Sequence, residues 1–207
     1  MNLPTQLTLL RVILTPVFLL LFFHNSLTLK LLSFLVFIIA SLTDWYDGYF
    51  AKKLGKVSQF GKFFDPLADK ILVSSAFIAF YYQGYVKLWI VVVIVVRDFL
   101  ITGLRSYALF TTRPVVTSGL ARAKTFLQMV SVFVIYVVYL LDHYSIYNGQ
   151  TFRILTAVQK LKIIDLLLWV VVFLTVYTGL RYLIENRAHL ISIIKACYHA
   201  VIPSNYS

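Results

Sequence analysis

Six mostly apolar stretches, each about as long as a membrane-spanning helix, are the feature that most constrains how this chain folds. They occupy residues 7–23, 27–50, 64–82, 88–109, 126–141 and 163–184. A helix needs about 20 such residues to cross a bilayer. Only helices and closed barrels satisfy their backbone hydrogen bonds in lipid, and the sequence lacks the alternating pattern of barrel strands. It therefore predicts an all-α integral membrane protein with six transmembrane helices.

The composition excludes the main alternatives to a membrane protein. Hydrophobic residues make up 60% of the chain and charged residues 13%, whereas a soluble domain carries about 25% charged residues. A soluble fold of this length buries only about 70% of the surface of its unfolded chain, which is too little to hide so much apolar area. The single cysteine, Cys197, allows no intrachain disulfide.

The charge balance predicts the topology. The formal net charge is +11, and in a membrane protein such an excess anchors the chain to anionic headgroups and sets its orientation. Six spans put both termini on one side, where the basic residues gather, including Lys52, Lys53, Lys56 and Lys62. That side is predicted to be cytoplasmic. We expect one domain over residues 1–207, a helix along the membrane interface after Arg187, and no nucleic-acid partner.

Half of the acidic residues fall in one short segment. The chain has eight Asp and Glu residues, and four of them, Asp44, Asp47, Asp65 and Asp69, lie between residues 44 and 69. The first two are three residues apart and the last two are four apart, so each pair shares one face of a helix. Carboxylates without a His or Cys partner suit magnesium, manganese or calcium, and pairs of such ions are common in phosphoryl transfer. The alternative is that these are helix-end charges neutralised by the neighbouring lysines.

The same segment resembles the motif of a known family. From Asp44 to Asp69 the chain follows D-x2-D-G-x2-A-R-x8-G-x3-D-x3-D, the motif of the CDP-alcohol phosphotransferases, with Lys52 in place of the usual arginine. Seven fixed positions match over 26 residues. The resemblance implies a membrane enzyme that uses two divalent cations, Mg²⁺ or Mn²⁺, to clamp the diphosphate of a CDP-linked substrate.

The resemblance also assigns roles to individual residues. It implies that Asp69 is the general base that deprotonates the acceptor hydroxyl as well as a metal ligand. The four implied metal ligands are Asp44, Asp47, Asp65 and Asp69. The residues implied to contact the CDP group are Asp44, Gly48, Ala51, Lys52 and Gly61. Lysine lacks the planar fork of arginine, so Lys52 is expected to weaken the grip on the diphosphate without abolishing function.

Other segments resemble the branch of this family that makes phosphatidylglycerol phosphate. They are the opening from Asn2 to Arg11, the run Arg97-Asp98 with Gly103-Leu104-Arg105, and the run from Ala121 to Gln128, which departs from the branch at Ala121 and Arg122. This resemblance implies transfer of a phosphatidyl group from CDP-diacylglycerol to sn-glycerol 3-phosphate, with release of CMP. Arg105, Arg122 and Lys124 would form an anion site for the acceptor phosphate, or they are ordinary cytoplasmic-side charges.

Several alternatives and smaller expectations complete the analysis. The acceptor could instead be phosphatidylglycerol, serine or an inositol compound, and the four aspartates could belong to a cation transporter or an inactive scaffold. Arg97 and Asp98 are predicted to form an internal ion pair that holds helices together. Asp142 and Asp165 are expected to be solvated. The family resemblance implies a homodimer in a bacterial plasma membrane, with its active site facing the cytoplasm.

Overall fold

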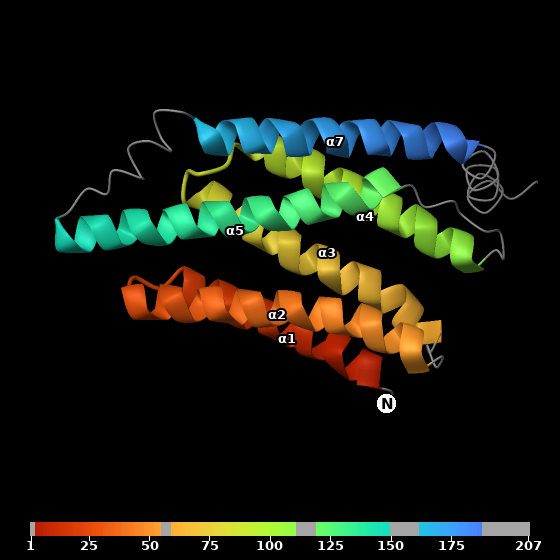
Figure 1. The fold of residues 1–207 in the computed structure, drawn as a ribbon, viewed down its shortest axis with the longest axis horizontal. Coiled ribbons are helices and arrows are strands. Elements are labelled where there is room, and N and C mark those ends of the chain that lie inside the picture. The colour runs from red at the N-terminus through yellow and green to blue at the C-terminus, as the bar shows by residue number, and fades with distance from the viewer. Residues whose placement is uncertain (1–2, 55–58, 111–118, 150–161, 188–207) are drawn as a thin grey trace, which may run out of the picture.

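The computed structural model describes residues 3–54, 59–110, 119–149 and 162–187 (Figure 1). Every regular element in these residues is an α-helix, which confirms the predicted all-α class. The helices are α1 (Leu3–Phe22), α2 (Leu27–Leu54), α3 (Gln59–Tyr82), α4 (Leu88–Phe110), α5 (Gly119–Asn148) and α7 (Ile163–Glu185). The segment after Arg187, where an interfacial helix was predicted, lies outside the described residues.

Each predicted apolar stretch lies on one of these helices, except that the first extends one residue beyond the end of α1. The boundaries differ most for α5, which was predicted over 126–141 and runs over Gly119–Asn148. Polar residues such as Lys124 and Asp142 interrupt the apolar pattern near both ends, yet lysine is a good helix former and aspartate is tolerated. The apolar pattern therefore marks the part of the helix suited to lipid and underestimates the length of the helix.

Two of the helical segments are long and apolar enough to cross a membrane, judged by length and composition among the described residues. They are Ala123–Tyr147 and Ile163–Glu185, and Thr8–Phe22 and Leu27–Thr43 are shorter apolar helices. Large apolar side chains are also exposed along α7, among them Leu166, Phe173 and Leu180. Soluble proteins rarely leave a continuous apolar stripe uncovered. These properties are those of a membrane protein.

Helix α3 joins two groups of helices (Figure 1). α1 and α2 lie side by side, and α1 also packs against α3. α4 and α5 both pack against α7, and α3 contacts α4 and α5. The helix that carries Asp65 and Asp69 therefore contacts both the α1–α2 pair and the group formed by α4, α5 and α7, and α2 also packs directly against α5.

A cluster of buried aromatic rings fills one end of the bundle. Phe22, the last residue of α1, stacks on Tyr139 of α5 with ring centroids 4.8 Å apart. It also meets Phe80, near the end of α3, edge to face at 5.6 Å. Phe18 and Tyr136 complete the cluster, and all five rings are almost fully buried. Such contacts hold three helices together beyond the effect of burial alone.

The turn between α3 and α4 depends on a glycine. Gly84 has a φ of 80°, a left-handed conformation that residues with a Cβ rarely adopt. The Gly84 amide donates to Tyr81 O and the Tyr85 amide donates to Phe80 O, both at 3.0 Å, which is a Schellman cap. The turn brings the Tyr85 hydroxyl within 2.6 Å of the Asp142 carboxylate. Asp142, which was expected to be solvated, is half-buried, and one of its oxygens accepts this hydrogen bond from another segment.

Candidate active site

The four aspartates predicted to bind metal lie on two successive helices. α2 continues through residues 44 and 47, and α3 contains residues 65 and 69. Each pair therefore lies within one continuous helix, which places its members on neighbouring turns. The side chains of several predicted site residues lie outside the described part of the structure. They are Asp44, Asp47, Asp65, Lys52 and Arg122, and the predicted close-approach positions Gly48, Ala51 and Gly61 fall in the same stretches.

Of the four aspartates predicted to bind metal, Asp69, which is also the predicted base, is the one whose side chain the structure describes. The residue is 9% exposed, and its Oδ2 accepts a hydrogen bond of 2.8 Å from the Lys70 ammonium. Its Oδ1 is buried and has no hydrogen-bond partner among the described residues. Buried carboxylate oxygens are normally paired. An unpaired, buried oxygen is suited to binding a cation or accepting a proton.

A second group of charged side chains lies between α4 and α5. Asp98, on α4, is 3% exposed, and Lys124, on α5, is 1% exposed. The Lys124 ammonium donates to Asp98 Oδ1, and Gln128 Nε2 donates to Asp98 Oδ2 at 3.1 Å. Both oxygens of this buried carboxylate are therefore held by residues of α5. Removing either charge of such a pair leaves the other uncompensated, which is strongly destabilising.

Arg97 extends this network to α7. Its Nη1 lies 3.1 Å from Asp98 Oδ1, which confirms the predicted internal ion pair. Its Nη2 donates to Thr178 Oγ1 at 2.7 Å. Gly179 gives the side chain room, because a Cβ at that position would lie 3.2 Å from Arg97 Cγ. Thr178 and Gly179 had no role in the sequence analysis, since no charge or motif in α7 marks them.

The network extends electrostatically toward the aspartate helix. Lys70, which pairs with Asp69 on α3, also interacts with both Asp98 and Lys124 by charge. The structure thus brings Lys124, one of the three residues predicted to bind the acceptor phosphate, into the same region as the predicted base.

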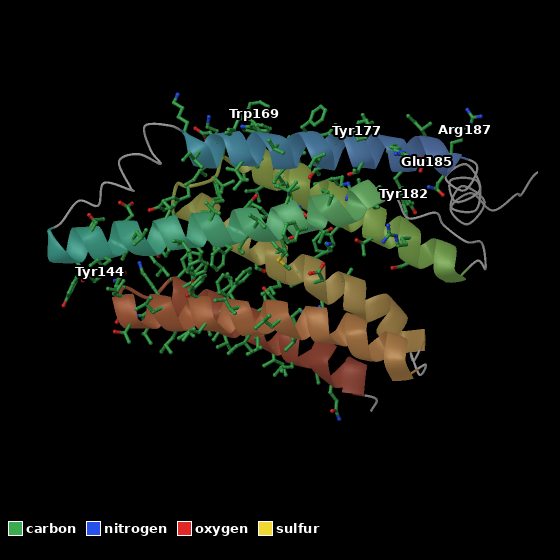
Figure 2. The ribbon with its side chains drawn as sticks, in the orientation of Figure 1. Tyr144, Trp169, Tyr177, Tyr182, Glu185 and Arg187 are labelled. Carbon is green, nitrogen blue, oxygen red and sulfur yellow. The ribbon has the colours of Figure 1, made fainter. Side chains whose placement is uncertain are left out.

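Arg105, another of those three residues, lies on α4. It is half-buried, its Nε is buried without a hydrogen-bond partner among the described residues, and it interacts electrostatically with Tyr182. Figure 2 shows Tyr182 on the side of α7 that faces the bundle, whereas Tyr177 points away from it. The described contacts of Arg105 and Lys124 therefore differ, and the structure does not show them gathered at one point.

Comparison with known proteins identifies the family. The model of the CDP-alcohol phosphatidyltransferase family matches residues 1–177. The chain belongs to the CDP-alcohol phosphatidyltransferase family. Two relatives bear the name CDP-diacylglycerol–glycerol-3-phosphate 3-phosphatidyltransferase. The protein of Bacillus subtilis (strain 168) is 37% identical over 197 residues, covering 89% of this chain and 95% of the relative. That of Rickettsia typhi (strain ATCC VR-144 / Wilmington) is 37% identical over 182 residues, covering 87% and 94%.

The match confirms the family that the aspartate motif predicted. In this CDP-alcohol phosphatidyltransferase the matched region contains the whole motif from Asp44 to Asp69. It also contains Arg105, Arg122 and Lys124, and ends inside α7. The roles of the individual residues remain predictions.

The chemistry of the candidate ligands fits the divalent cations that this CDP-alcohol phosphatidyltransferase is predicted to use. The four aspartates supply only oxygen donors, which Mg²⁺ and Mn²⁺ prefer. The unpaired buried Oδ1 of Asp69 agrees with this donor set. Among the described side chains no three metal-ligating groups gather, and three of the four predicted ligands lie outside that part of the structure.

Proposed function

We propose that this protein transfers a phosphatidyl group from CDP-diacylglycerol to sn-glycerol 3-phosphate, giving phosphatidylglycerol phosphate and CMP. The observation that carries this proposal is the shared name of relatives that align with the chain over almost their whole length. The aspartate motif supports the same chemistry, and the segments around Arg105 and Lys124 support the same acceptor.

The reaction requires a base beside the acceptor hydroxyl. As that hydroxyl oxygen attacks the phosphorus that carries the diacylglycerol, Asp69 takes its proton. The bond between this phosphorus and the CMP oxygen breaks, and CMP leaves. Asp69 suits this role because its buried Oδ1 has no hydrogen-bond donor among the described residues. Two divalent cations held by the four aspartates would neutralise the diphosphate and stabilise the charge that develops on its oxygens.

The two substrates would be bound by different parts of the chain. The small residues Gly48, Ala51 and Gly61 would let the cytidine nucleotide approach the backbone, with Lys52 beside the diphosphate. The phosphate of glycerol 3-phosphate would be bound by Arg105, Arg122 and Lys124, since a dianionic acceptor needs cationic donors.

The proposed activity also fits a specific membrane arrangement. We propose six membrane-spanning helices in a bacterial plasma membrane, with both termini and the active site on the cytoplasmic side. The distribution of basic residues supports this orientation, and the exposed apolar side chains support contact with lipid. CDP-diacylglycerol would enter sideways between helices, and glycerol 3-phosphate would come from the cytosol. We also propose that the protein works as a homodimer.

A panel of acceptors tests the proposed function. Purified protein in detergent is given CDP-diacylglycerol, Mg²⁺ or Mn²⁺, and one of glycerol 3-phosphate, phosphatidylglycerol, serine or inositol phosphate, and CMP release is measured. We expect release with glycerol 3-phosphate only, and loss of release with a chelator. Recovery after excess Mg²⁺ or Mn²⁺ is added is the control for damage by the chelator.

The other outcomes separate the alternatives. Release with a different acceptor would retain the chemistry of the four aspartates and overturn the assigned acceptor. No release with any acceptor, from protein shown to be folded, would favour a cation transporter or an inactive scaffold.

A further inference from the structure

The best-anchored charged side chain described in the bundle is Asp98, which no part of the proposed mechanism uses. It accepts hydrogen bonds from Arg97 and Lys124 at Oδ1 and from Gln128 at Oδ2. Donors from two helices thus bond both of its oxygens, and the carboxylate has little freedom to turn.

Lys124 depends on this carboxylate. A lysine side chain is a flexible stem with a point charge at its end, and at 1% exposure its ammonium has left water. Asp98 is the only carboxylate that the described contacts place against it. Asp98 therefore both compensates the charge of Lys124 and fixes where its ammonium lies.

Fixing the ammonium has a direct use in acceptor binding. An ammonium has three donor hydrogens, and the contact with Asp98 uses one of them. Because the group is already out of water, an arriving phosphate does not have to strip its hydration shell. A cation that is both positioned and desolvated binds an anion more strongly than a lysine moving freely in water.

Two further observations connect Asp98 with the predicted site. Arg105 lies seven residues after Asp98 on α4, so both residues lie on the same face of that helix two turns apart. On the other side, Lys70 interacts by charge with Asp98 and Lys124. Asp98 therefore contacts one predicted phosphate-binding residue, Lys124, shares a helix face with another, Arg105, and is influenced by the charge of Lys70, the partner of Asp69.

We propose that Asp98 is a positioning residue for the acceptor, which holds the Lys124 ammonium where it binds the phosphate of glycerol 3-phosphate. This inference rests on the proposed function. A purely structural ion pair between α4 and α5 would affect the stability of the protein but not its affinity for one particular substrate. The proposed role of Asp98 is different, because it affects the affinity for glycerol 3-phosphate.

The test compares how each substrate saturates the variants. Asp98→Asn removes the charge and keeps the shape, and Asp98→Glu keeps the charge. We expect Asp98→Asn to raise KM for glycerol 3-phosphate by about tenfold, with KM for CDP-diacylglycerol within about twofold of wild type. Inorganic phosphate should lose potency as an inhibitor by a similar factor. Asp98→Glu should restore most of the affinity.

Control variants separate positioning from general damage. Asp142→Asn removes another carboxylate with a hydrogen bond, that to Tyr85, and should leave both KM values unchanged. Combining Asp98→Asn with Lys124→Met should raise KM for glycerol 3-phosphate no further than Lys124→Met alone, because both changes disable the same contact.

A milder variant covers the case in which Asp98→Asn does not fold. Gln128→Met removes the donor to Asp98 Oδ2 and leaves every charge in place. We expect a rise of about threefold in KM for glycerol 3-phosphate alone. An unchanged KM in this variant would overturn the inference.

Several results with the folded variants would contradict the proposal. A lower turnover number in Asp98→Asn, with the KM values for both substrates equal to those of wild type, would show that Asp98 only ties helices together. A lower KM for glycerol 3-phosphate in Asp98→Asn would show that the carboxylate competes with the phosphate. If wild-type protein releases no CMP with glycerol 3-phosphate, the proposed function fails. If wild type is active and Asp98→Asn has normal KM values, only this inference fails.

Discussion

Lys30, in the first turn of α2, donates a hydrogen bond to His143 Nε2 near the end of α5, although 113 residues separate them in the chain. The ammonium also lies 5.0 Å from the centre of the Tyr139 ring. Lys30 is 4% exposed, so its charge depends on these two neighbours. The contact joins α2 to α5, two helices that pack directly against each other.

This pair predicts an asymmetric response to mutation. His143→Leu leaves the buried ammonium without its acceptor and should reduce the free energy of unfolding by about 2 kcal/mol. Adding Lys30→Met removes that ammonium, so the double variant should be more stable than His143→Leu alone. Thermal unfolding in detergent measures both. A double variant that is less stable than either single variant would contradict this account.

Replacing threonine by valine should have different effects on stability at two positions of α7, Thr178 and Thr175. Thr178 Oγ1 accepts the hydrogen bond from Arg97 Nη2, so Thr178→Val leaves a charged donor unsatisfied and should cost about 1–3 kcal/mol. Thr175 Oγ1 is buried without a partner among the described residues, so Thr175→Val should be neutral or stabilising. Unfolding midpoints of the two variants, measured side by side, check the signs. Equal losses would mean that the Arg97 contact contributes nothing.

The hydrogen bond between Tyr85 and Asp142 predicts a dependence on pH. Burial and this bond raise the pKa of the Tyr85 hydroxyl above its ordinary value. The stability that the hydroxyl contributes is therefore complete below pH about 10 and is lost as the pH rises further. We expect Tyr85→Phe to be less stable than wild type by about 1.5 kcal/mol at pH 7–9, with the difference narrowing above pH 10.

The control for this measurement is the neighbouring tyrosine. Tyr82→Phe alters a side chain that is 70% exposed and should leave stability unchanged at pH 7–9. A difference between wild type and Tyr85→Phe that stays constant up to pH 11 would show that folding does not raise the pKa of the Tyr85 hydroxyl.

The role assigned to Asp69 predicts that replacing it lowers turnover while the protein still folds. Asp69→Asn keeps the size of the side chain and removes its basicity, so turnover should fall by about 100-fold or more. Asp165→Asn makes the same change at an exposed position on α7 and should have no effect. Near-normal turnover in folded Asp69→Asn protein would mean that the base has been assigned wrongly.

The helices were predictable because each needs only local information. Apolar runs separated by polar segments gave all six described helices, and the misjudged ends of α5 lie where charged residues continue a helix beyond its apolar part. The aspartate motif could also be predicted from the sequence, since its chemistry depends on spacings of three and four residues within single helices.

The contacts between distant residues were not predictable in this way. Asp142 looked like a solvated charge because nothing near it in sequence explains it, and its partner Tyr85 lies 57 residues away. Thr178 and Gly179 are ordinary residues of an apolar helix until Arg97 is seen to pack on them. The pair of Arg97 and Asp98 could be predicted, because the two residues are adjacent in sequence.

The position of the aromatic cluster has a consequence for how the bundle opens. Phe80 lies eleven residues after Asp69 on α3, which is about 16 Å along a helix, and Phe18 and Phe22 lie in the last turns of α1. Amide protons around these rings should therefore be among the slowest to exchange with solvent, and those at the Asp69 end should exchange through smaller, local openings. The rings are therefore expected to keep their end of the bundle in register when local openings occur at the other end.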